Sequence, residues 1–287
     1  MDQREIFDSG FFESLHRMKL LKKLSPSAFG LWGNRKSGAK GNSLEYSDFR
    51  EYILGDDWRR IDWNSYGRTD RLLVKLFVEE KECLFNIFVD CSSSMDFGNA
   101  HKGRCACRLC AALGFIILNQ QDRVKVVCTE GGGIFKIPAM TGTASFPKLL
   151  RQLSQIVYTP DYNLWNVIRN ESFQSKGVTV VISDFFLKTD LEHILKYLTW
   201  QKQKIVLLHV LCDEELHPGM DGTLNLIDSE DKKNIKVTMN SGVLKNYNKA
   251  LEAFIERHRA LAKKYHALYR IVPAALPLEK AFWEGLA

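Results

Sequence analysis

The chain has 287 residues, of which 45% are hydrophobic and 26% are charged, and this composition excludes a disordered, collagen-like or coiled-coil protein. Its 40 Lys and Arg residues against 34 Asp and Glu residues give a net charge of +6, which is too small to indicate nucleic-acid binding by itself. Length and composition therefore predict one large globular domain with an accessory segment.

The sequence also favours a cytoplasmic location. The longest apolar runs, residues 111–118 and 205–212, are far shorter than the roughly 20 residues that a membrane-spanning helix needs. Acidic residues interrupt any apolar stretch near the amino terminus that could act as a signal peptide; they are Asp2, Glu5, Asp8 and Glu13. The seven cysteines are an odd number, and without a secretory signal we expect reduced thiols. We therefore expect no direct membrane insertion.

The first predicted element is an amphipathic helix that ends before Pro26. Helical spacing puts Phe12, Leu15 and either Met18 or Lys19 near one face of this helix, with a basic opposite side. Residues 30–43 then concentrate glycine with lysine and arginine and are expected to form a loop or hairpin tip. They lack the order G-x-x-x-x-G-K-[ST], so a phosphate-binding P-loop is not predicted.

From residue 84 onward, short apolar runs alternate with helical stretches. The predicted strands are 84–89, 124–128, 178–182 and 205–211, and the predicted helices are 103–120, 144–156, 163–170 and 190–201. Nearly continuous apolar strands alternating with helices indicate an α/β fold, with a doubly wound, mostly parallel sheet covered on both faces. The glycines at 131–133 predict a hairpin turn, and residues 241–266 predict a C-terminal helix.

Two polar segments follow predicted strands. The first is Asp90-Cys91-Ser92-Ser93-Ser94, after strand 84–89, and the second is Ser183-Asp184, after strand 178–182. Ligands of parallel sheets collect at the carboxyl ends of the strands, so both aspartates are expected to face one crevice. Carboxylate and hydroxyl oxygens are ligands for Mg²⁺ or Mn²⁺. The predicted metal ligands are therefore Asp90, Ser92, Ser94 and Asp184, with positions left open for a partner's carboxylate.

Other interpretations of these residues stay open. The segment from Asp90 also fits an ordinary helix-capping sequence. A haloacid-type phosphoryl-transfer site needs a second Asp where this chain has Ser92. Ser94 is not predicted to be a hydrolase nucleophile, because no G-x-S-x-G sequence surrounds it. Cys105, Cys107 and Cys110 could suggest a metal cluster, but Cys105 and Cys107 point about 200° apart on a helix. The three thiols are therefore interpreted as packing residues.

The Asp90–Ser94 loop resembles the metal-ion-dependent adhesion site of von Willebrand factor A-like domains. Just before it, Gly55-Asp56-Asp57-Trp58-Arg59-Arg60-Ile61-Asp62-Trp63, here called the 55–63 block, resembles the signature of the bacterial domain-of-unknown-function family number fifty-eight. Residues 78–80, 213–216 and 226–230 resemble further landmarks of that family. The resemblance runs from about residue 40 to the C-terminus.

The resemblance implies a von Willebrand factor A-like domain at residues 82–240. An N-terminal accessory segment at 1–81 carries the 55–63 block, and a C-terminal helical segment at 241–287 packs on the domain. Family members are associated with MoxR-type AAA+ ATPases and are thought to be non-enzymatic adaptors in chaperone-like assembly or remodelling. The expected partners are such an ATPase and its client protein, without nucleic acid. The alternatives are a metal-dependent phosphoester hydrolase and a metal-free scaffold of the same fold.

One position departs from the pattern of the adhesion site. A threonine ligand is expected in a T-x-L sequence, and Tyr162 stands in its place here. Asp161 or Asn163 are alternative oxygen donors, and so are Thr141 and Thr143 from an earlier loop. This departure leaves open a site that binds its ion weakly or not at all.

The 55–63 block mixes acidic residues and arginines with two tryptophans. Such a mixture suits a salt-bridged structural platform, in which guanidinium groups pair with carboxylates and stack on indoles. It also suits a docking surface for the ATPase. Nucleic-acid binding is the weakest interpretation, because the neighbouring carboxylates repel phosphates.

Overall fold

The computed structural model describes residues 6–24, 46–77, 83–130, 133–160, 163–173, 176–187, 189–218, 222–227 and 234–281. The chain forms two compact units, of which the first comprises residues 1–28 and 83–287 and the second comprises residues 29–82. The predicted accessory segment 1–81 is therefore divided, because its first helix belongs to the larger unit. Each unit is described by itself below.

A six-stranded sheet in the order β10-β7-β6-β3-β4-β5 forms the centre of the larger unit. Five strands are parallel, and β5 pairs antiparallel with β4 at one edge. The strands are β3 (Leu84–Val89), β4 (Arg123–Glu130), β5 (Gly133–Met140), β6 (Val178–Ser183), β7 (Lys204–Leu211) and β10 (Leu268–Pro273). The fold is thus mixed α/β with a mostly parallel central sheet, as predicted.

The central strands are buried because helices cover both faces of the sheet. Every residue of β6 is buried, and so are all residues of β3 after its first. Strand β10 was not predicted, because its side chains are only partly buried and it lacks a continuous apolar run. The C-terminal segment, predicted to be helical, therefore also supplies an edge strand. The predicted hairpin turn falls partly on residues 131–132, outside the described residues.

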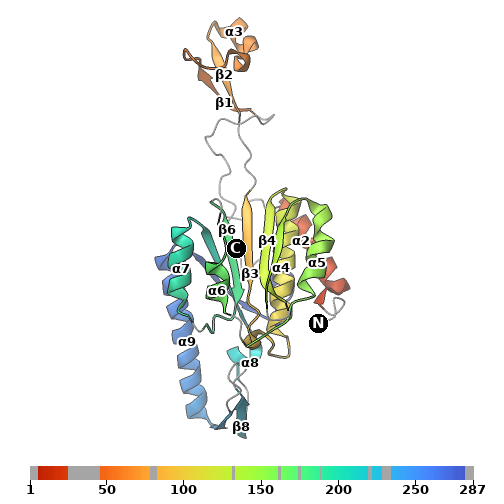
Figure 1. Cartoon of the computed structure of the whole chain (residues 1–287), viewed down its shortest axis with the longest axis vertical. Coiled ribbons are helices and arrows are strands. Elements are labelled where there is room, and N and C mark those ends of the chain that lie inside the picture. Colours follow the sequence, from red (N-terminus) through yellow and green to blue (C-terminus); the bar gives the residue numbers. More distant parts are fainter. Residues whose placement is uncertain are drawn as a thin grey trace. The chain divides into compact units, whose positions relative to one another are not determined.

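The helices of this unit lie on the two sides of the sheet, with α2, α4 and α5 together on one side and α6, α7 and α9 on the other (Figure 1). This division is expected, because right-handed crossovers that lead in opposite directions from β3 and β6 place their helices on opposite faces. The helices are α2 (Ser9–Leu24), α4 (Lys102–Asn119), α5 (Phe146–Leu153), α6 (Leu164–Arg169), α7 (Leu191–Trp200), α8 (Asp213–Leu216) and α9 (Ser241–Lys264).

The N-terminal helix α2 is present, but the predicted buried face is wrong at one position. Phe11 and Leu15, spaced four residues apart, are the buried pair, whereas Phe12 is 46% exposed. The reason is the anchoring of the preceding segment, where Arg108 of α4 donates hydrogen bonds to the Ile6 carbonyl and to Asp8. These bonds fix the rotation of the helix on α4.

The smaller unit contains an antiparallel pair, β1 (Tyr46–Glu51) and β2 (Leu73–Phe77), with a short 3₁₀ helix η3 (Trp58–Arg60) and a helix α3 (Trp63–Thr69). Asp57 caps η3 and Asp62 caps α3, while Asp56 pairs with Arg50 at 2.8 Å. The acidic residues of the 55–63 block are thus used within the unit. Trp58 and Trp63 are 63% and 58% exposed.

A second antiparallel pair, β8 (Gly222–Ile227) and β9 (Asn234–Met239), forms a hairpin between α8 and α9. Figure 1 shows α8 and β8 beyond the end of the sheet at which the arrows of β3 and β6 finish. Among the residues that the structure describes, none of the helices has the length and apolarity needed to cross a bilayer.

Candidate functional site

The candidate site lies where the chain changes direction in the sheet. Strand β3 has β4 on one side and β6 on the other, so the chain moves outward from β3 in two opposite directions, and ligands bind at such switch points. Asp90 follows β3 and Asp184 follows β6. The Asp90 N–H donates to the Ile182 carbonyl at 2.9 Å, which continues the pairing of the two strands. The two predicted carboxylates therefore lie at the same end of the sheet.

Asp90 is held from two sides at the floor of this site. Its Oδ1 accepts the Ser92 N–H at 2.9 Å, and its Oδ2 accepts the Ser183 hydroxyl at 2.5 Å. The Asp90 side chain is almost completely buried. Burial, and then the nearby Asp184, raise the pKa of Asp90, the hydrogen bonds from Ser183 and Ser92 lower it, and the net result is a pKa of about 6. The site thus contains a carboxylate that lacks sufficient positive charge around it.

The two predicted serine ligands lie together above Asp90. Ser92 Oγ and Ser94 Oγ are 3.0 Å apart, and both residues are half-buried. Neighbouring ligands of an octahedral Mg²⁺ ion, with bonds of 2.0–2.1 Å, are about 3 Å apart. Asp90, Ser92 and Ser94 therefore fit a hard divalent cation.

Asp184 is in a different environment. Its Oδ2 accepts a hydrogen bond from Lys102 Nζ at 2.7 Å, and its Oδ1 accepts the Phe186 N–H at 3.2 Å. Lys102 Nζ also contacts Glu215 Oε1 at 2.7 Å. Sequence reasoning missed Lys102 and Glu215. The sequence signal that could have drawn attention to Lys102 is its place at the start of a helix, where the helix dipole disfavours a positive charge and a lysine therefore needs acidic partners.

The structure corrects the proposed substitutes for the threonine ligand. Met140 pairs with Val124, so the residues that follow Met140, including Thr141 and Thr143, lie at the amino end of β4. Asp90 lies at the opposite end of the six-residue strand β3, about 20 Å away. The alternative in which Thr141 or Thr143 reaches the site is therefore wrong.

The other two alternative oxygen donors, Asp161 and Asn163, directly precede α6. Asn163 Oδ1 accepts the Asn166 N–H at 3.2 Å and so caps this helix. Asp161 and Tyr162 lie outside the described residues. Thr159, which sequence reasoning did not single out, forms a parallel bridge with Ser92. Its loop therefore runs directly beside the serine loop.

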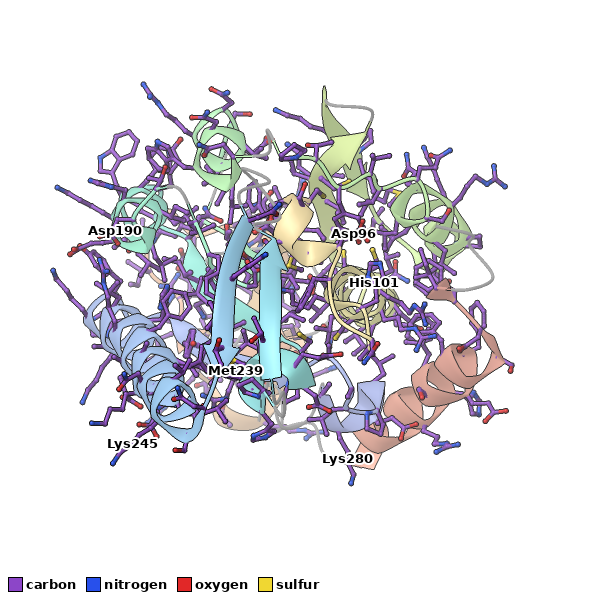
Figure 2. All side chains as sticks on the ribbon, turned by 90° about the horizontal axis from the view of Figure 1, so that it is seen from below. Asp96, His101, Asp190, Met239, Lys245 and Lys280 are labelled. Atoms are coloured by element: carbon purple, nitrogen blue, oxygen red, sulfur yellow. The ribbon has the colours of Figure 1, made fainter. Side chains whose placement is uncertain are left out.

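The loop between Ser94 and α4 is closed by the contact of Asp96 with His101 Nε2 at 2.9 Å. Figure 2 shows these two residues close together at this end of the molecule, with the β8–β9 hairpin in front. Further along α4, Cys105 and Cys107 are buried, and burial raises their pKa values to about 12 and about 11. This agrees with their interpretation as packing residues.

Two aromatic rings flank Lys102 at this end of the sheet. The Nζ atom lies 5.7 Å from the centre of the Phe97 ring and 5.6 Å from that of Phe186. Phe97 is 47% exposed and Phe186 is 50% exposed. Aromatic residues are enriched at protein–protein interfaces relative to the rest of the surface.

Within the described part of the chain, no group of three or more His, Cys, Asp or Glu side chains is arranged to hold a metal ion. A metal site at the strand ends therefore depends on the serine hydroxyls as well as on carboxylates.

A family model described as "Protein of unknown function DUF58" matches residues 48–259. "Uncharacterized protein Mb1516" of Mycobacterium bovis and "Uncharacterized protein Rv1480" of Mycobacterium tuberculosis are each 28% identical to the chain over 162 residues, or 54% of it. The match covers 51% of each relative, so the chain spans about half of their length.

Two solved structures are similar in part. The conserved hypothetical protein BatB from Bacteroides thetaiotaomicron is 17% identical, with a TM-score of 0.41, and covers 71% of this chain and 96% of its own. An aerotolerance-related membrane protein from Bacteroides fragilis is 16% identical, with a TM-score of 0.41, and covers 70% of this chain and 98% of its own.

Proposed function

The chain belongs to the family described as Protein of unknown function DUF58, and on this premise we propose that it is a non-enzymatic, metal-dependent adaptor that binds other proteins. The proposed binding surface is the carboxyl end of the parallel sheet in a von Willebrand factor A-like domain. The proposed location is the cytoplasm.

One observation carries the proposal. Ser92 Oγ and Ser94 Oγ lie 3.0 Å apart beside a buried Asp90, and Asp90 experiences both burial and the charge of Asp184. Oxygen ligands with too little positive charge around them favour a divalent cation. Asp90, Ser92 and Ser94 would hold Mg²⁺ or Mn²⁺, whereas Asp184, the fourth predicted ligand, is already bonded to Lys102. When bound, the ion offers an open coordination position to a carboxylate of the partner.

The residues around the site have defined tasks in this proposal. The Ser92 N–H and the Ser183 hydroxyl orient Asp90, so its carboxylate does not need to reorganise when the cation binds. Phe97 and Phe186, both about half-exposed, supply apolar contact area next to the polar centre. A polar centre flanked by aromatic rings suits a protein ligand that presents an acidic residue among apolar ones.

The proposed partners are a MoxR-type AAA+ ATPase and the client that it remodels. This part rests on the resemblance of the 55–63 block and of the Asp90–Ser94 loop to the family pattern. It is consistent with a site that binds a carboxylate-bearing surface.

The test is co-purification of such an ATPase with the tagged full chain, in Mg²⁺ and nucleotide. We expect capture by the wild type and by the control Ser172→Ala, whose serine is exposed and precedes β6, whereas the site follows the carboxyl ends of the strands. Capture should be lost in EDTA and in the Ser92→Ala/Ser94→Ala double variant. Capture that persists in EDTA would show that binding does not use a metal ion, and no capture at all would exclude this partner.

A phosphoesterase assay separates the adaptor from the hydrolase alternative. The same carboxylates around a metal ion could in principle support hydrolysis. We expect no turnover of p-nitrophenyl phosphate with Mg²⁺ or Mn²⁺. Turnover that Asp90→Ala abolishes would replace the adaptor proposal with an enzymatic one.

A further inference from the structure

Lys102 occupies an unfavourable place for a lysine. It is the first residue of α4, where the helix dipole repels a positive charge, and its side chain is 1% exposed. Burial alone would lower the pKa of Lys102, but Asp184 and Glu215 more than offset this effect and the pKa is raised. A buried ammonium group at this position is stable only because the two carboxylates neutralise it.

The ammonium group joins three separate parts of the chain. It bonds Asp184 Oδ2, 82 residues away, and Glu215 Oε1, 113 residues away, both at 2.7 Å. Glu215 is fixed in turn, because its Oε2 accepts the Cys212 N–H at 2.9 Å. Lys102 is therefore held from two sides and has little freedom to leave Asp184.

The surroundings of the ammonium group strengthen this hold. Its two carboxylate partners are 1% and 14% exposed, and the rings of Phe97 and Phe186 lie 5.7 and 5.6 Å away. Exclusion of water makes a paired charge interaction stronger and an unpaired charge costlier. Asp184 thus already has a cation bonded to it, supplied by the chain itself.

Asp90 has no such contact with Lys102 among the described hydrogen bonds and ion pairs, since its oxygens accept Ser92 N–H and Ser183 O–H. The carboxylates at this end of the sheet are therefore divided. Asp184 and Glu215 share the internal ammonium group, whereas Asp90 is left beside the two serine hydroxyls.

We propose that Lys102 acts as an internal cation that keeps Asp184 from serving as a ligand of the divalent ion. This inference rests on the proposed function. Lys102 is a positioning residue in this arrangement, because its pairing with Asp184 limits the affinity of the Asp90–Ser92–Ser94 site for the ion. A partner carboxylate then contributes a larger share of the binding, so the ion and the partner bind more tightly together than either does alone.

The first test compares Mn²⁺ binding by full-length variants that differ in Asp184. In Glu215→Gln, Lys102 keeps its contact with Asp184. In Lys102→Met/Glu215→Gln, Asp184 is free, although the net charge equals that of the wild type. Calorimetry and Mn²⁺ electron paramagnetic resonance should show affinity at least about tenfold higher in the double variant than in the wild type, which has the same net charge, and than in Glu215→Gln, because an additional carboxylate becomes available. Adding Asp184→Asn to the double variant should remove the gain.

A second test does not require the lysine to be removed. Asp184→Asn in the otherwise wild-type chain leaves Lys102 paired with Glu215. We expect this substitution to change the Mn²⁺ affinity by less than about threefold, because Asp184 is not an ion ligand while Lys102 holds it. A loss of tenfold or more would show that Asp184 binds the ion directly in the wild type and would overturn the inference.

The outcomes separate this inference from the proposed function. Wild-type binding that depends on Asp90 but is no weaker than that of the double variant overturns the inference alone. If neither protein binds Mn²⁺, while circular dichroism shows both to be folded, the metal-dependent function fails together with the inference.

Discussion

The Asp90 carboxylate is buried, accepts two hydrogen bonds and lies near a second negative charge. Burial and the neighbouring charge make the ionised Asp90 destabilise the folded protein, but they also favour the binding of a cation. Its pKa of about 6 lies above the usual value of 3.8. The folded protein therefore retains a proton on Asp90 that the unfolded chain releases. As pH rises from about 4 through 6, the ionised Asp90 progressively reduces the free energy of unfolding.

Because the ionised Asp90 lowers the free energy of unfolding, replacing it with a neutral side chain should raise this free energy. Without metal ions at pH 7, Asp90→Asn should raise the free energy of unfolding by about 1–3 kcal/mol, measured by urea denaturation in EDTA. The substitution should also abolish the increase in melting temperature that Mn²⁺ gives to the wild type. The control is Asp70→Asn, at an exposed, left-handed position where asparagine is well accommodated. A less stable Asp90→Asn protein would contradict the conclusion that the buried, ionised Asp90 destabilises the folded protein.

A second buried titratable residue lies behind the site. His209 is fully buried, and its Nδ1 is 2.5 Å from the Tyr269 hydroxyl. Burial, and then the neighbouring His258, lowers the pKa of His209 to about 3. The unfolded chain therefore binds a proton near pH 6.5 that the folded protein does not accept until about pH 3.

The wild type should lose about 2–3 kcal/mol of stability from His209 between pH 6.5 and 4.5. The contribution is present above pH 6.5 and disappears as pH falls toward 3. In His209→Gln, which stays neutral, the slope of stability against pH should be smaller over this interval, whatever its stability at pH 7. Urea denaturation at both pH values checks this, with exposed His193→Gln as the control. An unchanged slope in His209→Gln would exclude His209 as the source.

At the residue scale, the sequence was sufficient to locate Asp90 and Asp184 but not their partners. The ends of parallel strands meet at one edge whatever the details of the packing, so two aspartates after two strands could be brought together by argument. Lys102 and Glu215 meet across 113 residues, through the packing of α8 against the start of α4. No local pattern encodes that approach.

At the scale of elements, the approach of α4 to the loop at Tyr158 positions the serine loop. A Cβ atom on Gly103 would lie 2.1 Å from the Tyr158 hydroxyl, so only glycine allows this contact. The next residue, Thr159, donates its N–H to the Cys91 carbonyl at 2.9 Å. The helix start, the Tyr158 loop and the serine loop are therefore packed as one group.

Gly103→Ala should disturb this group. We expect a loss of about 1–3 kcal/mol in the free energy of unfolding, because the added methyl group overpacks a buried contact, and weaker Mn²⁺ binding, because the serine loop shifts with its neighbour. Gly67→Ala is the matched control, since its Cβ would meet nothing within 4 Å and alanine favours the helix. Wild-type Mn²⁺ affinity in Gly103→Ala would show that the serine loop is positioned independently of Tyr158.

The elements that could be predicted are those with continuous apolar runs, such as β3 and β6. The missed strand β10 follows the 24-residue helix α9 and lies at the edge of the sheet. An edge strand buries fewer of its side chains, so its sequence carries a weaker signal than a central strand does. The order of the strands, which creates the switch point beside Asp90, depends on pairing between distant segments.

At the scale of the whole molecule, the smaller unit interrupts the larger one, since residues 29–82 separate α2 from β3. All the described residues of the candidate site belong to the larger unit. The 55–63 block, with its largely exposed Trp58 and Trp63, belongs to the smaller unit. Binding of the ion and recognition of a partner through the 55–63 block can therefore be separated by experiment.

Replacing residues 29–82 with a flexible Gly/Ser linker of about 20 residues tests this separation. The larger unit keeps its sheet, its helices and the described residues of the site, so the Mn²⁺ affinity should stay within about twofold of the wild type. If the 55–63 block docks the ATPase, capture should fall sharply in the linker variant, and also in full-length Trp58→Ala/Trp63→Ala, in which these side chains alone are truncated. If the block is only a structural platform, capture should survive in both proteins. Loss of Mn²⁺ binding in a folded linker variant would contradict the assignment of the ion site to the larger unit alone, because the removed residues contain none of its proposed ligands.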